Sequence, residues 1–290
     1  MAIRPRRSAL YMPGSNARTL EKAKTLAADV VIFDLEDAVA PEAKDLARDQ
    51  VMAAVAGGGY GNRELVVRIN GLDTPWGLTD LARAAEVAPD AILVPKVSSP
   101  SQLITVGQAL APAPEKTRVW AMIETPLAIL NLREIAAAAE DPVTRLSCFV
   151  LGTNDLVKET RAALDENRTA ALFWLSAAVT AARAFGIDVL DGVYNAFRDL
   201  EGFRRECQQG RQLGMDGKTL IHPDQIAPAN EIFSPTEEEV AWARKIIAAF
   251  EQPENQGKGA ITVDGRMVEL LHRQMAQRTV ALAEAIAAKS

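Results

Sequence analysis

Short apolar runs alternate along the chain with longer amphipathic segments. The run VVIFDL is typical, and Ala- and Leu-rich stretches such as NARTLEKAKTLAAD separate it from its neighbours. Buried parallel strands read as continuous apolar runs, whereas amphipathic helices repeat apolar residues every three or four positions. The pattern therefore predicts strands and helices in alternation. The predicted strands lie near residues 7–12, 30–35, 65–69, 91–96, 118–123, 147–151, 187–191 and 217–221.

Eight strands alternating with helices over about 220 residues predict an α/β fold, a (β/α)8 TIM barrel, for residues 1–230. A doubly wound sheet is the alternative, but it usually carries a glycine-rich phosphate turn after its first strand. The stretch GGGYG at 57–61 instead precedes a strand, and neither a GxGxxG motif nor a P-loop is present. This absence weakens any interpretation that involves a nucleotide cofactor.

Residues 231–290 follow a different pattern. The sequence Ser234-Pro235-Thr236-Glu237 has the form of a capping box that opens a helix to about Phe250. The stretch AITVDGRMVE alternates around Asp264-Gly265, a strong hairpin signal, and an amphipathic helix follows. We expect a helix–hairpin–helix extension that serves as a mobile lid or as an oligomerisation arm.

Composition narrows the classes of function. The formal net charge of −6 argues against a broad nucleic-acid surface. No apolar run approaches the roughly 18 residues of a membrane-spanning helix. Two cysteines, Cys148 and Cys207, are too few for a disulfide framework, so we expect a cytoplasmic protein.

Charged residues stand at the ends of the predicted strands, where barrel enzymes place their chemistry. Three carboxylates end the second strand, and like charges in a buried setting need a positive partner nearby. Arg68 is the candidate partner, and its planar guanidinium also suits a carboxylate or a developing oxyanion. The strand-end residues are Asp34, Glu36, Asp37, Arg68, Asn70, Lys96, Glu124, Asp155, Asp191 and His222.

Glu124 and Asp155 are the best candidates for a pair of carboxylates that bind one ion, because they follow adjacent predicted strands about 4.8 Å apart. Two carboxylates with water suit Mg²⁺ or Mn²⁺ better than zinc. The alternative is an ordinary buried salt bridge between Glu124 and Arg68. Gly152 and Thr153 are expected to offer backbone N–H groups to a ligand carboxylate.

Lys96 raises a rival chemistry. A desolvated lysine at a strand end can form a Schiff base, as in one class of aldolases. The alternative for Lys96 is an ion pair with one of the nearby carboxylates. Asp191 and His222 are expected to be pocket walls or hydrogen-bonded structural residues.

Several motifs, read in order, resemble one known family. They are RSALYMPGSNARTLEKA, DVVIFDLEDAVAPEAK, VVRING, AMIETPLAILN, LGTNDL and GKTLIHPDQI. These motifs resemble the citrate lyase beta-subunit-like acyl-CoA lyases, which include malyl-CoA and citramalyl-CoA lyases. The resemblance runs from about residue 7 to the C-terminal helix. It implies a Mg²⁺-dependent (β/α)8 lyase that cleaves a 3-hydroxyacyl thioester into an acyl-CoA and a 2-oxo acid.

The resemblance also implies roles for particular residues. Glu124 and Asp155 match the metal ligands, and Arg68 matches the arginine at the substrate oxygen. Glu36 and Asp37 would orient water at the metal, and Lys44, which follows the same acidic run, is expected to contact the substrate. The segment that holds coenzyme A matches Arg7, Tyr11 and Lys22.

Glu269 in DGRMVELL matches a lid aspartate that acts on the active site of a neighbouring subunit. The resemblance therefore implies a homo-oligomer, a trimer or a multiple of it. Glutamate in place of aspartate shifts the carboxyl group by about 1 Å, enough to affect a rate. Asn16 stands after PGS, where malyl-CoA lyases tend to have a basic residue.

Three alternatives stay open at this point. The chain could be the beta subunit of a citrate lyase that acts on a carrier-protein thioester. It could be an aldolase that acts on 2-oxo acids without CoA. It could also be a catalytically idle barrel used for assembly, although such a barrel has no reason to keep both Glu124 and Asp155.

Overall fold

The computed structural model describes residues 3–289. The chain divides into two compact units, of which the larger spans Arg6–Glu231. The smaller unit comprises residues 3–5 and 232–289 of the described chain. Within the described residues, no helix combines the length and hydropathy needed to cross a membrane.

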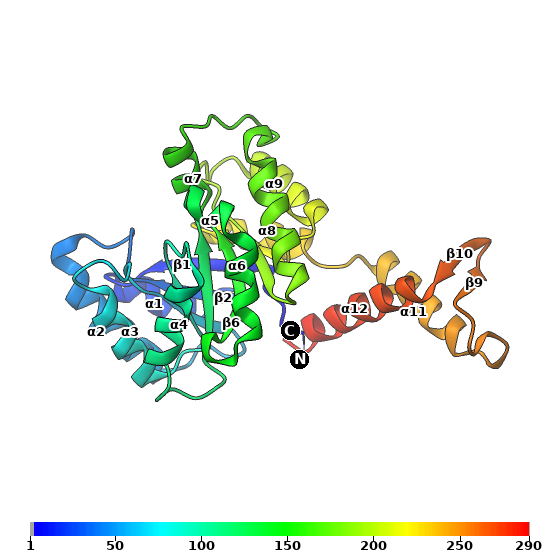
Figure 1. Ribbon diagram of the computed structural model, residues 1–290, viewed down its shortest axis with the longest axis horizontal. Coiled ribbons are helices and arrows are strands. Elements are labelled where there is room, and N and C mark those ends of the chain that lie inside the picture. The colour runs from blue at the N-terminus through cyan, green and yellow to red at the C-terminus, as the bar shows by residue number, and fades with distance from the viewer. Residues whose placement is uncertain (1–2, 290) are drawn as a thin grey trace. The chain divides into compact units, whose positions relative to one another are not determined.

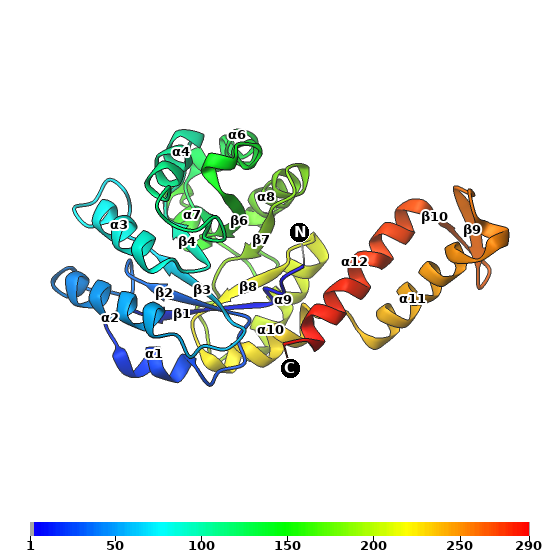
Figure 2. The ribbon, with the colours of Figure 1, turned by 90° about the horizontal axis from the view of Figure 1, so that it is seen from below.

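Eight parallel strands close the larger unit into a barrel, in which β1 pairs with both β2 and β8. The predicted (β/α)8 barrel is thus confirmed, and the closed sheet excludes the doubly wound alternative. Figures 1 and 2 show the helices arranged around the strands. The strands are β1 (Ser8–Pro13), β2 (Val30–Asp34), β3 (Glu64–Arg68), β4 (Ala91–Val94), β5 (Arg118–Ile123), β6 (Leu146–Leu151), β7 (Asp188–Asp191) and β8 (Gly217–Leu220).

Ten helices in the described part of the chain follow or connect these strands. The α2 helix ends at Gly57, and its next residue, Gly58, has a positive φ of 62°. Glycine adopts that conformation without steric cost, so the helix stops there. The helices are α1 (Ala17–Ala23), α2 (Lys44–Gly57), α3 (Gly77–Val87), α4 (Pro100–Ala109), α5 (Pro126–Leu130), α6 (Leu132–Ala137), α7 (Thr153–Thr160), α8 (Leu172–Ala184), α9 (Leu200–Leu213) and α10 (Ile226–Ile232).

The barrel interior is filled by alternate residues of the strands, because successive side chains of a strand point to opposite faces. Val30 and Ile32 of β2, Val66 of β3, and Trp120 and Met122 of β5 belong to one buried cluster. The same alternation carries on at the carboxyl ends of these strands. It therefore directs the side chains of Asp34, Arg68 and Glu124 toward the mouth of the barrel.

The opposite end of the barrel is closed by ion pairs. Arg6 donates from Nε and Nη2 to both carboxylate oxygens of Glu64, at 2.8 and 2.7 Å, and from Nη1 to Asp188 at 2.6 Å. Its guanidinium also lies 4.8 Å from the ring centroid of Trp120. Arg7 donates from Nε to Asp29 at 2.7 Å. These arginines lie at the amino ends of the strands, where their ion pairs link β1 to residues at the starts of β2, β3 and β7.

The smaller unit contains a helix–hairpin–helix, as the sequence predicted. Thr236 and Glu239 form the capping box of α11 (Glu237–Glu251). The hairpin strands β9 (Ala260–Val263) and β10 (Arg266–Glu269) pair antiparallel, and α12 (Leu270–Ala287) follows them. A small core of its own stabilises the unit, and it comprises Ala243, Ile246, Phe250, Ile261, Val263, Val268 and Ala276. The role of this unit as a lid stays a prediction.

Candidate functional site

Arg68 is held rigidly at the carboxyl end of β3. Its Nε and Nη2 donate to the two oxygens of Asp34 at 2.7 and 2.6 Å, and both residues are buried. Asp34 also accepts the backbone N–H groups of Glu36 at 2.8 Å and Ala38 at 3.2 Å. One carboxylate therefore fixes the guanidinium and folds the loop after β2.

The third guanidinium nitrogen of Arg68 faces the remaining acidic residues of that loop. Nη1 lies 2.8 Å from Glu36 Oε2 and 3.2 Å from Asp37 Oδ2. Within residues 3–289, no aligned hydrogen bond reaches Glu36 Oε2, although this oxygen is buried. Burial raises the pKa of Glu36 to about 8. The positive charge of Arg68 lowers this pKa, but the negative charges of Asp37 and Glu124 raise it again. Arg68 is thus the positive partner of the three carboxylates that follow β2. It donates hydrogen bonds to Asp34 and Asp37, and it lies 2.8 Å from Glu36.

Lys44 stabilises the loop after β2 through its backbone. Its ammonium donates to the backbone carbonyls of Leu35 at 2.8 Å and Glu36 at 2.7 Å. It is buried, and it lies 5.5 Å from the ring centroid of Trp76. The prediction that Lys44 contacts the substrate is therefore corrected: the ammonium is occupied by backbone, and Lys44 fixes the position of Glu36.

Glu124 is buried directly after β5. Its Oε1 accepts the backbone N–H of Lys96 at 2.8 Å. Burial raises the pKa of Glu124 to about 7. The backbone hydrogen bond from Lys96 lowers this pKa, whereas the negative charge of Asp155 raises it. Asp155 is half-buried in the first turn of α7. The alternative for Glu124, a salt bridge with Arg68, does not form in the described part of the chain, because Asp34, Glu36 and Asp37 occupy the guanidinium.

These carboxylates suit a hard cation. Burial and mutual repulsion disfavour the ionised forms of Glu36 and Glu124, and a divalent ion between the carboxylates would reverse both effects. Within residues 3–289, no three His, Cys, Asp or Glu side chains are placed to hold a metal ion together. An ion on Glu124 and Asp155 would thus be completed by water and ligand oxygens, as is usual for Mg²⁺.

Tyr11 lies inside the mouth, next to Arg68. The guanidinium carbon of Arg68 is 4.8 Å from the centroid of the half-buried Tyr11 ring, and the Tyr11 hydroxyl is 4.0 Å from the sulfur of Met122. Burial raises the pKa of Tyr11, so the hydroxyl stays protonated as a hydrogen-bond donor. Tyr11 therefore places a hydroxyl donor beside Arg68 at the carboxyl end of the barrel.

The structure does not bring every predicted site residue to the mouth. Arg7 precedes β1 and pairs with Asp29 at the amino end of the barrel, so its predicted contact with coenzyme A is corrected. The N–H of Gly152 donates to the Ile123 carbonyl at 3.0 Å and is not available to a ligand carboxylate. Thr153 is buried at the start of α7, and Lys22 is exposed on α1.

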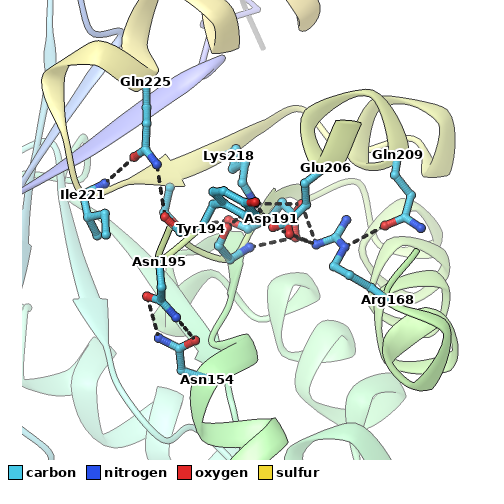
Figure 3. Close-up of polar contacts among 12 residues, drawn as sticks. Asn154, Arg168, Asp191, Tyr194, Asn195, Glu206, Gln209, Lys218, Ile221 and Gln225 are labelled. Carbon is cyan, nitrogen blue, oxygen red and sulfur yellow. Dashed lines mark hydrogen bonds and ion pairs between the residues drawn. The ribbon is translucent and has the colours of Figure 1, made fainter. Parts of the chain in front are cut away.

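The structure also shows a buried charge cluster that sequence reasoning missed (Figure 3). Lys218 donates to Asp191 at 3.1 Å and to Glu206 at 2.5 Å, and Arg168 donates to both Asp191 oxygens at 2.8 and 2.9 Å. The neighbouring Leu190 faces the barrel interior, so Asp191 faces the surrounding helices. The sequence analysis expected Asp191 to be a pocket wall or a hydrogen-bonded structural residue, and a lysine stands inside the apolar strand GKTLI, but their partners were not predicted.

This cluster holds the loop after β7 against the start of α7. Lys218 donates to the Gly192 carbonyl at 2.5 Å, and a Cβ atom on Gly192 would lie 2.5 Å from Thr153 Oγ1. The side-chain amides of Asn195 and Asn154 pair at 2.8 and 3.3 Å (Figure 3). The loop therefore packs against the two residues that precede Asp155.

We expect that Gly152→Ala lowers the free energy of unfolding by about 1–3 kcal/mol. A Cβ atom there would lie 2.4 Å from Glu124 Cβ and 2.5 Å from Glu124 Oε2, so the carboxylate must move. Gly152 has a φ of −99°, which alanine adopts freely, so the effect reports the contact alone. Denaturant unfolding measures it, with Gly57→Ala as control because nothing lies within 4 Å of that site. Equal stability of Gly152→Ala and wild type would contradict the tight packing around Glu124.

The chain is similar in sequence and in fold to several known proteins. The family model described as HpcH/HpaI aldolase/citrate lyase matches residues 7–223. A protein named (3S)-malyl-CoA thioesterase from Cereibacter sphaeroides (strain KD131) is 50% identical over 284 residues, which cover 98% of this chain and 96% of the relative. Citrate lyase subunit beta from Escherichia coli (strain K12) is 36% identical over 273 residues, covering 92% and 89%.

A solved structure adds a ligand-bound neighbour. It is protein CitE from Mycobacterium tuberculosis in complex with magnesium, acetoacetate and coenzyme A. Its TM-score is 0.76 at 31% sequence identity, and the match covers 97% of this chain and 98% of that one.

Proposed function

Because the chain belongs to the HpcH/HpaI aldolase/citrate lyase family, we propose that it is a Mg²⁺-dependent carbon–carbon lyase. Its substrate would be a 3-hydroxyacyl-CoA of the malyl-CoA or citramalyl-CoA type, and its products an acyl-CoA and a 2-oxo acid. One observation carries the proposal: the buried carboxylate of Glu124 interacts electrostatically with both Asp155 and the buried Arg68 at the carboxyl end of the barrel. The magnesium, acetoacetate and coenzyme A held by the CitE relative support it.

Glu124 and Asp155 would hold Mg²⁺, or Mn²⁺ in its place. When bound, the ion supplies positive charge that stabilises negative charge on substrate oxygens. The third and fourth carboxylates, Glu36 and Asp37, would orient water beside the ion. Glu36 has a pKa near neutrality and so can also accept a proton from the substrate hydroxyl.

The proposed reaction needs two proton transfers. A base takes the hydroxyl proton, the carbon–carbon bond breaks as the hydroxyl carbon becomes a carbonyl, and the electron pair passes to the thioester as an enolate. Arg68 stabilises the developing negative charge. Glu269 then delivers a proton to the α-carbon of the thioester, from the smaller unit of a neighbouring subunit. Closure of that unit would exclude water from the enolate.

We expect that Glu269→Gln lowers turnover by about 100-fold or more, because an amide cannot donate the proton. Glu269 is half-buried at the end of β10, and its backbone N–H donates to His272 at 2.9 Å, so the side chain is not needed for that bond. The measurement is deuterium exchange at the methyl group of acetyl-CoA in heavy water. The exposed Glu254→Gln is the control, and full exchange by Glu269→Gln would remove the residue from the mechanism.

Coenzyme A would lie along α1, where Lys22 is exposed, with the thioester near Tyr11 and Thr153. The proposed homotrimer follows from the family resemblance, and the proposed cytoplasmic location follows from the two cysteines and the lack of a long apolar run. Sedimentation of the purified protein tests the assembly.

A second candidate is hydrolysis of the same thioester, which the relative named (3S)-malyl-CoA thioesterase favours. Incubation with malyl-CoA and with each citramalyl-CoA enantiomer separates the two. Acetyl-CoA with glyoxylate or pyruvate indicates the lyase, whereas free CoA with malate or citramalate indicates hydrolysis. Loss of either activity in EDTA supports the metal. No turnover by protein that binds Mg²⁺ would indicate a carrier-protein thioester or a substrate without CoA.

The proposal also predicts how pH changes the stabilisation by Mg²⁺. The pKa of Glu36 rises from 4.5 to about 8 and that of Glu124 to about 7, so metal-free folded protein binds more protons than the unfolded chain. Stability from these groups is therefore largest at low pH and falls as pH rises through about 7 to 8. Mg²⁺ binds the ionised forms, so we expect a larger rise in Tm with Mg²⁺ at about pH 8.5 than at about pH 6. Thermal unfolding with and without Mg²⁺ measures this, and a smaller rise at the higher pH would contradict the proposed site.

A further inference from the structure

We infer that Lys96 binds the carboxylate of the 2-oxo acid half of the substrate, and so selects hydroxyacyl groups that carry a free carboxylate. This inference rests on the proposed function and names a residue of the same site. Three cations, Arg68, Lys44 and Lys96, lie on or next to the loops that follow β2, β3 and β4.

Two of these cations are already occupied by the protein. Arg68 is paired with Asp34, Glu36 and Asp37. Lys44 donates to two backbone carbonyls and is buried. Within residues 3–289, by contrast, the Lys96 ammonium makes no ion pair or hydrogen bond, and the side chain is exposed. Lys96 is therefore the cation that remains available to an anionic ligand.

The backbone of Lys96 places it next to the candidate metal ligands. Its N–H donates to Glu124 Oε1 at 2.8 Å, and it follows β4 at the carboxyl end of the barrel. Its φ of 54° lies in the left-handed region, which is uncommon for a residue with a side chain. Such strain gathers at functional sites, where the surrounding structure enforces it. Here the strained conformation is the one in which Lys96 holds Glu124.

The charges around Lys96 favour the ammonium form. The side chain is exposed to water, which stabilises the charged amine, and the carboxylates of Glu36, Asp155 and Glu124 are the negative charges that interact with it. An ammonium suits a carboxylate, whereas Schiff-base formation needs the neutral amine. The rival aldolase chemistry expected of Lys96 is therefore disfavoured.

The ligand chemistry completes the argument. A 2-oxo acid brings a carboxylate into a mouth that already contains Glu36, Asp37, Glu124 and Asp155. A divalent ion on Glu124 and Asp155, with Arg68 on Glu36 and Asp37, leaves no positive charge for the carboxylate of the ligand, so a further cation favours its binding. Lys96 supplies it beside Glu124. A hydroxyacyl group without the carboxylate would gain nothing from Lys96.

The test uses Lys96→Met, which keeps most of the aliphatic stem and removes the charge. With saturating Mg²⁺, calorimetric titration of glyoxylate is expected to show a dissociation constant raised about 10- to 100-fold, while acetyl-CoA binds as in wild type. Mg²⁺ alone should bind as tightly as in wild type or more tightly, because a neighbouring positive charge is gone. If Lys96 had only a structural role, Lys96→Met would change the binding of glyoxylate, acetyl-CoA and Mg²⁺ together.

Three further variants sharpen the test. Lys96→Arg should recover much of the glyoxylate affinity. Lys96→Gly allows the left-handed backbone and its bond to Glu124, so it isolates the side chain and should match Lys96→Met. Lys158→Met, on the exposed face of α7, is the control expected to equal wild type.

Unchanged glyoxylate affinity in Lys96→Met, while wild type turns over malyl-CoA, overturns the inference and leaves the proposed function intact. Wild type that neither binds glyoxylate with Mg²⁺ nor turns over malyl-CoA overturns both. Borohydride trapping of glyoxylate on wild-type Lys96, but not on Lys96→Arg, would also overturn the inference in favour of a Schiff base.

Discussion

Glu124→Gln is expected to lower kcat/KM by about 1,000-fold or more and to abolish measurable Mg²⁺ binding, without loss of stability. An amide is a poor ligand for a hard cation in place of a carboxylate. Its carbonyl oxygen can still accept the Lys96 N–H at the position of Oε1, so the local fold is preserved. Because burial and Asp155 raise the pKa of Glu124 to about 7, the carboxyl group is ionised above that pH at a cost to folding stability. Neutral glutamine removes this cost.

The measurements are steady-state kinetics, Mg²⁺ titration by calorimetry and thermal unfolding at about pH 8. Glu159→Gln, on an exposed position of α7, is the matched control. A variant that keeps Mg²⁺-dependent activity would show that the ion binds elsewhere. We predict that Glu124→Gln is as stable as wild type or more stable, because it removes a buried negative charge. Loss of activity through unfolding of the variant would contradict this prediction.

The strands and the residues at their carboxyl ends were predictable from the sequence. Buried parallel strands must be apolar, so their positions are visible as apolar runs. The alternation of side chains then directs Asp34, Arg68 and Glu124 to one end of a barrel. The fold follows from local patterns because barrel strands occur in chain order and each has the same pattern.

The partners of long side chains were not predictable in the same way. Arg7 was expected beside coenzyme A, yet it lies one residue before β1 and reaches Asp29, one residue before β2. Lys44 was expected to contact the substrate, yet its stem carries the ammonium back to two carbonyls. A sequence gives the position of such a residue along its element, but not the direction in which a flexible chain extends.

The charge cluster behind β7 and β8 shows a further limit. Lys218 and Asp191 pair across neighbouring strands, but Arg168 comes from a loop and Glu206 from α9. In the sequence, Arg168 and Glu206 each have the pattern of an ordinary surface charge. Only the assembled fold buries them together, because two cations and two carboxylates offset one another's cost of desolvation.

Arg68→Lys is expected to lower kcat by about 100- to 1,000-fold with a smaller change in KM. Lysine keeps the charge but lacks the planar fork that pairs with both oxygens of Asp34 at 2.6 and 2.7 Å. The cation would then be misplaced relative to the developing enolate, although substrate still binds. Steady-state kinetics with malyl-CoA separates the two parameters. An equal loss in kcat for Arg68→Lys and Arg68→Met would mean that charge alone contributes nothing.

Arg68→Met alone leaves Asp34 buried without its cation, which we expect to cost about 3–5 kcal/mol of folding free energy. The double variant Arg68→Met with Asp34→Asn removes both charges, so we expect most of that stability to return while activity stays lost. Denaturant unfolding and kinetics on the same preparations measure the two effects. Recovery of activity together with stability would assign Arg68 a structural role only. Recovery of stability alone would show that its charge is required at the mouth of the barrel, where Asp34 holds it.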